Sequence, residues 1–154
     1  MQMDVKRVEV AAFQVSGPQV RTRNEDERYA ETARIGGLWG GFFAEGLAER
    51  IANRQPDSPV YGVYSGYESD ASGYFDVTAA VAVTTPAPGY PTVEVQAGPY
   101  LVFEGRGAMP QTVIDTWGRI WSYFEQHPGQ RRFATDFEVY TGPDSVAVYI
   151  GIVE

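Results

Sequence analysis

One order of residues occurs twice along this chain, and the repetition restricts its possible folds more than any other feature. A Gly-Pro pair interrupts an extended run at Gly17-Pro18, and a second pair does so at Gly98-Pro99. A helical segment with a Trp-Gly pair follows each, at Trp39-Gly40 and at Trp117-Gly118. Because proline lacks the N–H that a central strand needs, each Gly-Pro pair predicts a bulge or a bend.

Both helical segments carry apolar residues at the spacing of one helix face. In the first segment these are Ile35, Leu38, Trp39, Phe42, Phe43 and Leu47. In the second they are Val113, Ile114, Trp117, Ile120, Trp121 and Phe124. Pro110 suits the first turn of the second helix, which we expect to end near residues 127–129.

Each helix is followed by two extended runs joined by a turn. These runs are "VYGVYSGY" and "YFDVTAAVAV" in the first half, then "FATDFEVY" and "SVAVYIGIV" in the second. Neither half could bury its helix stripe and its sheet face alone. The sequence therefore predicts one α+β domain over residues 1–154, with duplicated strand–helix–strand–strand units and pseudo-twofold symmetry. The halves are residues 1–84 and 92–154, and residues 85–91 connect them.

Composition excludes several classes of function. The 154 residues include no cysteine and one histidine, His127, so disulfides, thiol catalysis, a zinc cluster and a serine triad are not expected. We expect neither a metal nor a cofactor. The formal charge is −8 with no basic run, which argues against direct nucleic-acid binding and favours cationic ligands. No apolar segment resembles a signal core or a membrane span, so we expect a cytoplasmic protein that does not contact membranes.

The stretch "DFEVY" places a carboxylate, Glu138, among strand residues. Burying an unpaired carboxylate is costly, so Glu138 faces water, holds a permanent partner, or receives a transient one. Alternation puts Glu138 on one strand face with Asp136 and Tyr140. If the opposite, apolar face lies under the helices, Glu138 points away from them. In the first half, Gly62, Tyr64, Gly66 and Glu68 form the analogous face, and its small residues would leave a hollow.

The ordered set of motifs resembles the GyrI-like effector-binding family, which serves as the ligand-sensing domain of AraC-type and MerR-type regulators. The motifs are "RTRNEDE", "IGGLWGGFFAEGL", "YGVYSGYESDASGYF", "VQAGPYLVFEGRG", and "DFEVY" followed by "VAVYIGIV". They extend over nearly the whole chain. The similarity is greatest to the stand-alone subgroup associated with integron gene cassettes.

The resemblance implies an antiparallel sheet with two main helices on one face and a central pocket between the halves. It also implies binding of amphipathic, often cationic or aromatic compounds by stacked rings and a buried Glu. The candidate carboxylates are Glu138 and Glu68, which the sequence does not rank. The candidate ring walls are Trp39, Trp117, Tyr64, Phe103, Tyr140 and Tyr149. A regulatory role would require a separate transcription regulator as a partner.

Structural roles compete with these assignments. Glu138 could be solvated or salt-bridged, both tryptophans fit helix-to-sheet packing, and Tyr64 and Tyr149 could be ordinary sheet aromatics. Residues 21–28 resemble a solvated loop with internal ion pairs. Close packing against the sheet would explain the glycines of the first helix as well as function would. These glycines are Gly36, Gly37, Gly40 and Gly41.

Three functions remain open, and small-molecule binding is the first. The alternative is a hydrolase of strained electrophilic small molecules, in which the pocket Glu acts as a general base, as some relatives imply. The sequence offers no convincing nucleophile for such an enzyme. A third function, contact with a DNA topoisomerase, comes only from relatives with this fold.

Overall fold

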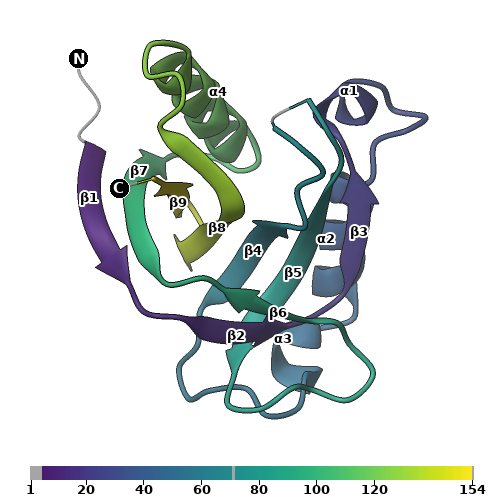
Figure 1. The fold of residues 1–154 in the computed structure, drawn as a ribbon. Coiled ribbons are helices and arrows are strands. Elements are labelled where there is room, and N and C mark those ends of the chain that lie inside the picture. The colour runs from purple at the N-terminus through teal and green to yellow at the C-terminus, as the bar shows by residue number, and fades with distance from the viewer. Residues whose placement is uncertain (1–4, 71, 154) are drawn as a thin grey trace.

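A computed structural model describes residues 5–70 and 72–153 (Figure 1). Nine strands form one sheet in which every hydrogen-bonded pair of strands is antiparallel. The elements are β1 (Val5–Val10), β2 (Phe13–Ser16), β3 (Gln19–Thr22), α1 (Asn24–Glu27), α2 (Ile35–Ala44), α3 (Leu47–Arg50), β4 (Val60–Ser65), β5 (Phe75–Val83), β6 (Thr92–Val95), β7 (Gly98–Arg106), α4 (Gln111–Glu125), β8 (Arg131–Gly142) and β9 (Ser145–Ile152).

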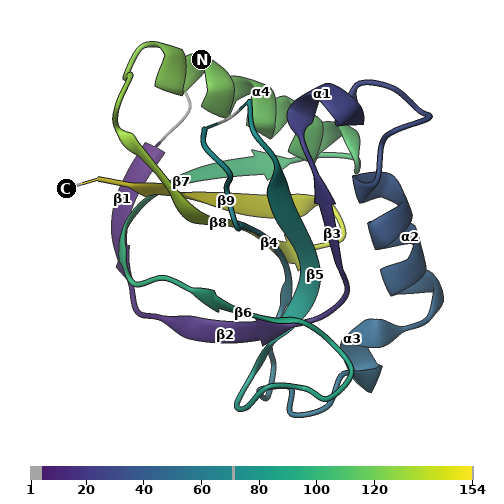
Figure 2. The ribbon, with the colours of Figure 1, turned by 45° about the vertical axis from the view of Figure 1, so that its right-hand side comes forward.

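The sheet curls back on itself because two long segments each bend once. Two residues separate β1 from β2, and two separate β6 from β7. The ladder β1–β7 therefore continues as the ladder β2–β6, while β2 also pairs with β5 and β7 also pairs with β9. Figure 2 shows the resulting curve, which encloses an inner face. That face holds a core of buried residues from several strands, namely Val15, Val63, Ala80, Val95, Tyr100 and Phe137.

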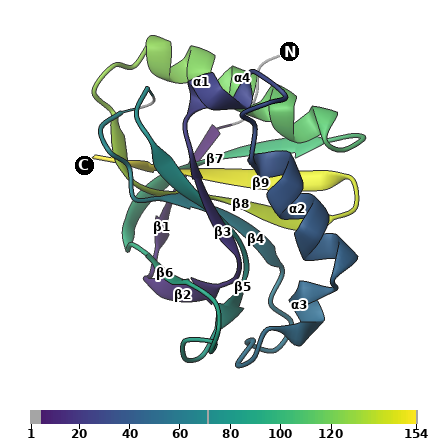
Figure 3. The ribbon, with the colours of Figure 1, turned by 90° about the vertical axis from the view of Figure 1, so that its right-hand side faces the viewer.

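The duplication places the two halves side by side at the centre of the sheet. Strand β4 of the first half pairs with β8 of the second, and Gly62 lies opposite Glu138. Helix α2 packs near β3 and β5, and α4 packs on β7 and β9. Both helices lie outside the curl (Figure 3). The predicted α+β fold, with two main helices on one face of an antiparallel sheet, is confirmed.

One of the two predicted breaks differs from the structure. Gly17-Pro18 separates β2 from β3, as predicted, but Gly98 and Pro99 begin β7 and the break lies two residues earlier, at residues 96–97. Pro99 is tolerated because the ladder between β7 and β9 starts at Tyr100, so Pro99 pairs only with Glu9 of β1.

The first helix is shorter than its apolar stripe. Helix α2 ends at Ala44, and Gly46 has a left-handed φ of 59° before α3 begins. The expectation of close packing at its glycines is wrong. A Cβ added at Gly36, Gly37 or Gly40 would meet no atom within 4 Å. The glycines of this helix therefore lower helix propensity without any steric need on the sheet side.

Residues 21–28 are more ordered than a solvated loop. They include the end of β3 and the short helix α1, and Arg23 pairs with Asp26 at 3.2 Å. Glu27 accepts the backbone N–H groups of Arg34 and Ile35 at 2.8 and 3.2 Å. It thereby caps the N-terminus of α2, where a carboxylate is favourable. No helix in the described ranges is long and apolar enough to cross a membrane.

Candidate functional site

A cavity of about 1840 Å³ lies between α2 and α4, above the seam of β4 and β8. It exceeds the roughly 300–1,000 Å³ of most small-molecule sites. Many of the side chains in its wall are aromatic. They include Trp39, Phe43, Tyr64, Phe133, Trp117 and Tyr140. Phe43, Ile114 and Trp121 also line the cavity although they are among the most exposed large apolar residues.

Glu138 lies in the floor of this cavity and is only 2% exposed. Its Oε2 accepts hydrogen bonds from the Tyr64 hydroxyl and from Trp117 Nε1, both at 2.8 Å. Its Oε1 accepts one from the Tyr140 hydroxyl at 2.7 Å. Gly62, directly opposite on β4, leaves the necessary room, because a Cβ there would lie 2.8 Å from Oε1. The carboxylate is therefore held by neutral donors.

Burial raises the pKa of Glu138, because low-dielectric surroundings disfavour its charged form. The three hydrogen bonds from Trp117, Tyr140 and Tyr64 lower that pKa, but burial outweighs them. Burial and the adjacent carboxylate raise the pKa of the Tyr64 and Tyr140 hydroxyls, so both remain protonated donors at neutral pH. Within the described part of the chain, Glu138 forms no ion pair.

Asp136, two residues earlier on β8, is fully buried and does have an ionic partner. Its Oδ2 accepts hydrogen bonds from Arg131 Nη2 at 2.8 Å and from the Tyr67 hydroxyl. Its Oδ1 accepts the backbone N–H of Gly151 at 2.8 Å. The Arg131 guanidinium carbon lies 4.5 Å from the centre of the Phe133 ring. This carboxylate is therefore neutralised by a cation packed against an aromatic ring.

Five of the eight predicted site residues meet at the cavity. Glu138, Trp39, Trp117, Tyr64 and Tyr140 all line it. Trp39 lies 5.3 Å from Tyr140, and Tyr64 lies 5.1 Å from Trp117, measured between ring centres. The expectation that Glu138 points away from the helices is wrong, because Trp117 of α4 donates to it. The opposite face of β8, with Phe137, lies inside the curled sheet.

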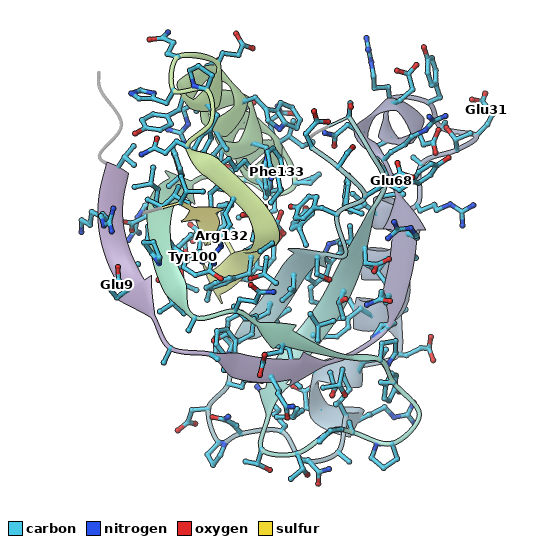
Figure 4. All side chains as sticks on the ribbon, viewed as in Figure 1. Glu9, Glu31, Glu68, Tyr100, Arg132 and Phe133 are labelled. Atoms are coloured by element: carbon cyan, nitrogen blue, oxygen red, sulfur yellow. The ribbon has the colours of Figure 1, made fainter. Side chains whose placement is uncertain are left out.

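The other three predicted residues lie elsewhere. Glu68 is exposed beyond the end of β4, where its Oε1 accepts the backbone N–H of Tyr74 at 3.4 Å (Figure 4). Phe103 is fully buried beneath α4 against Tyr123. Tyr149 stacks on Phe137 at 4.5 Å in the inner core. Aromatic type alone did not distinguish the wall of the cavity from these two cores.

Sequence reasoning missed Arg131, Tyr67 and Phe133. In the view of Figure 4, Phe133 lies between α4 and the upper end of β5. The pairing of β8 with β9 is irregular between Arg131 and Asp136. This irregularity brings together residues that regular alternation would place on opposite faces of the strand. The sequence feature that pointed toward these residues was the position of Asp136 on the same strand face as Glu138.

Comparisons with known proteins identify the family and the fold. The sequence matches the integron-associated effector binding protein family over residues 8–152. An integron cassette protein from the mobile metagenome of Vibrio cholerae is 37% identical, with a TM-score of 0.82 over 97% of this chain and 95% of that chain. SAV2435, solved bound to tetraphenylphosphonium, shares the fold at 18% identity, with a TM-score of 0.80 over 98% of this chain and 94% of that chain. Among curated proteins, no match to the sequence was found. The chain belongs to the family of integron-associated effector binding proteins.

Proposed function

We propose that the cavity binds amphipathic organic cations, with the positive charge against Glu138 and the apolar part against the rings of α2 and α4. Membership in a family of effector binding proteins supports small-molecule binding in general. The preference for a cation follows from the charges of the site.

The observation that carries the proposal is the contrast between two neighbouring carboxylates. Asp136 is neutralised by Arg131, whereas Glu138 is equally buried and has only neutral donors among residues 5–70 and 72–153. A buried ionised carboxylate without a countercharge is costly. A cationic group of a bound ligand would supply at Glu138 the positive charge that Arg131 supplies at Asp136. That charge would be present only while the ligand is bound.

The aromatic wall adds to the attraction for a cation. Trp39, Trp117, Tyr64 and Tyr140 surround the carboxylate, and a cation over a ring face gains about 0.5–2 kcal/mol, depending on desolvation. Rings also supply apolar contact without requiring one ligand shape. We expect broad specificity, since the cavity is large and Phe43 and Trp121 stay partly exposed at its wall.

A structural neighbour supplies a suitable probe. SAV2435 was solved with tetraphenylphosphonium, an organic cation with four phenyl rings. Tetraphenylborate has nearly the same shape and the opposite charge, so the two ions separate the effect of charge from that of apolar contact. Calorimetry and tryptophan fluorescence should show that the phosphonium binds saturably and more than about tenfold tighter than the borate.

Two variants test whether Glu138 causes this preference. Glu138→Gln removes the buried charge, and the exposed Glu68→Gln removes an equal charge away from the cavity. We expect E138Q to lose most of the preference for the phosphonium and E68Q to retain it. Circular dichroism establishes that both variants fold. Equal affinity for both ions in the wild type, or no saturable binding of either, would contradict the proposed function.

A further inference from the structure

Arg131 forms part of the cavity wall and is packed tightly there. Its side chain is 9% exposed, and its guanidinium carbon lies 4.5 Å from the Phe133 ring centre and 5.7 Å from that of Tyr67. Phe133 has a left-handed φ of 57°, which is unfavourable for a bulky residue. Surrounding contacts therefore hold this strained backbone, and the ring above Arg131, in place.

The hydrogen-bond donors of Arg131 are only partly used. Nη2 donates to Asp136 Oδ2 at 2.8 Å and to the Tyr67 hydroxyl at 3.2 Å. Nε is buried without an acceptor, and Nη1 has no hydrogen-bond partner among the residues that the structure describes. A guanidinium carries five N–H donors, and leaving buried donors unpaired is unfavourable. Arg131 therefore has donor capacity left over at the wall of a ligand-sized cavity.

We propose that Arg131 forms a second subsite, which binds a neutral hydrogen-bond acceptor on the same ligand. This proposal rests on the proposed function and specifies its ligand class. Arg131 and Asp136 cancel in charge, and Glu138 in its ionised form adds one negative charge to the cavity floor. The complementary ligand carries one positive charge and an uncharged oxygen acceptor, such as an ester or carbonyl, rather than a second charge.

The positions of the two polar groups allow one ligand to reach both. Trp117 Nε1 donates to Glu138, and the Trp117 ring centre lies 5.9 Å from the Arg131 guanidinium carbon. One side chain thus spans from the carboxylate to the guanidinium. A planar cation that covers the Trp117 ring would place its charge near Glu138 and a pendant acceptor near Arg131.

Two matched dyes test the subsite. A rosamine is a xanthylium cation with a plain phenyl substituent, and the corresponding rhodamine methyl ester carries an ester on that phenyl. We expect the ester to bind the wild-type protein about tenfold tighter, as one hydrogen bond to a charged donor provides. Arg131→Lys keeps a cation for Asp136 but removes the planar set of donors. In R131K the advantage of the ester over the rosamine should fall to about twofold or less.

The outcomes separate this inference from the proposed function. If both dyes bind the wild type equally, and E138Q weakens both, the Arg131 subsite is wrong and cation binding stands. If neither dye binds saturably, both proposals fail. An ester advantage that persists in folded R131K also overturns the subsite. Should R131K not fold, the comparison of the two dyes on the wild-type protein decides alone.

Discussion

Glu138 and Asp136 lie two residues apart on β8 with side chains on the same face, yet only Asp136 is paired with a cation, Arg131. Both carboxyl groups are almost fully buried. Burial is therefore similar at the two positions, but the two carboxyl groups are stabilised by different partners. Asp136 is paired within the protein, whereas Glu138 is the carboxylate that we propose to receive the charge of a ligand. We therefore expect mutation of Asp136 to lower the stability of the protein, and mutation of Glu138 to alter cation binding.

Asp136→Asn should destabilise the fold strongly. It leaves the buried Arg131 without its countercharge, and breaking a buried ion pair from one side costs about 3–5 kcal/mol. The matched control is Glu9→Gln, which removes one partner of the exposed pair Arg7–Glu9. Exposed pairs contribute about 0–1 kcal/mol. Urea denaturation compares the free energies of unfolding, and equal losses for D136N and E9Q would contradict a structural role for the buried pair.

Cation binding should weaken as the pH falls, and it should do so at higher pH than an ordinary carboxyl would require. Burial raises the pKa of Glu138 above its ordinary value of 4.5, so the site becomes protonated earlier on acidification. Tyr64 and Tyr140 have pKa values raised by burial and do not titrate in this range. Binding of a cation to ionised Glu138 should therefore release a proton when it begins from the protonated form.

The raised pKa of Glu138 makes the stability of the free protein depend on pH in the opposite direction to cation binding. Its contribution is fully present below the unfolded pKa, near 4.5, and is lost as the pH rises through the folded pKa. Calorimetric titration with tetraphenylphosphonium between about pH 5 and pH 8 measures the affinity, and urea denaturation of the free protein over the same range measures its stability. In E138Q the affinity should be nearly independent of pH over this range. A flat profile in the wild type would exclude Glu138 as the binding carboxylate.

The duplication could be predicted from the order of motifs along the sequence. The placement of Glu138 on one strand face with Asp136 could be predicted from strand alternation. Alternation places Glu138 and Asp136 on one face, but it does not reveal which face carries the helices. That depends on how β1–β2 and β6–β7 bend, which closes the inner core around Phe137. The orientation of Glu138 toward the helices could therefore not be deduced from the pattern.

Strand alternation in the sequence also could not identify the partner of Asp136. Arg131 and Asp136 lie five positions apart, which regular alternation assigns to opposite faces, and only the irregular pairing near Phe133 brings them together. The absence of Phe103 and Tyr149 from the cavity wall has a related reason. A strand residue of the right type and phase can lie under a helix or inside a curled sheet, and only tertiary structure separates these environments.

Alanine substitutions in α2 should stabilise the protein. Gly37 and Gly40 lie on this helix with open space where an added Cβ would lie, so each Gly→Ala change should add about 0.5–1 kcal/mol. Gly46 also has open space, but its φ of 59° disfavours any Cβ. Gly46→Ala should therefore destabilise the protein, which isolates backbone conformation from packing. Thermal unfolding measures all three, and destabilisation by G37A or G40A would show that α2 needs its glycines for structure.

Gly62→Ala should impair the site without changing its charge. The new Cβ would lie 2.8 Å from Glu138 Oε1 and 2.9 Å from Trp39 Cζ2, so both contacts must be relieved by movement. Overpacking of this kind costs about 1–3 kcal/mol, and the displaced groups are the proposed cation contacts. Tetraphenylphosphonium affinity should fall about tenfold or more. Gly118→Ala, on α4 with no atom within 4 Å of its Cβ, is the control and should bind normally. Unchanged affinity in G62A would mean that the cation does not depend on the geometry at Gly62, Glu138 and Trp39, and the proposed binding mode would then be wrong.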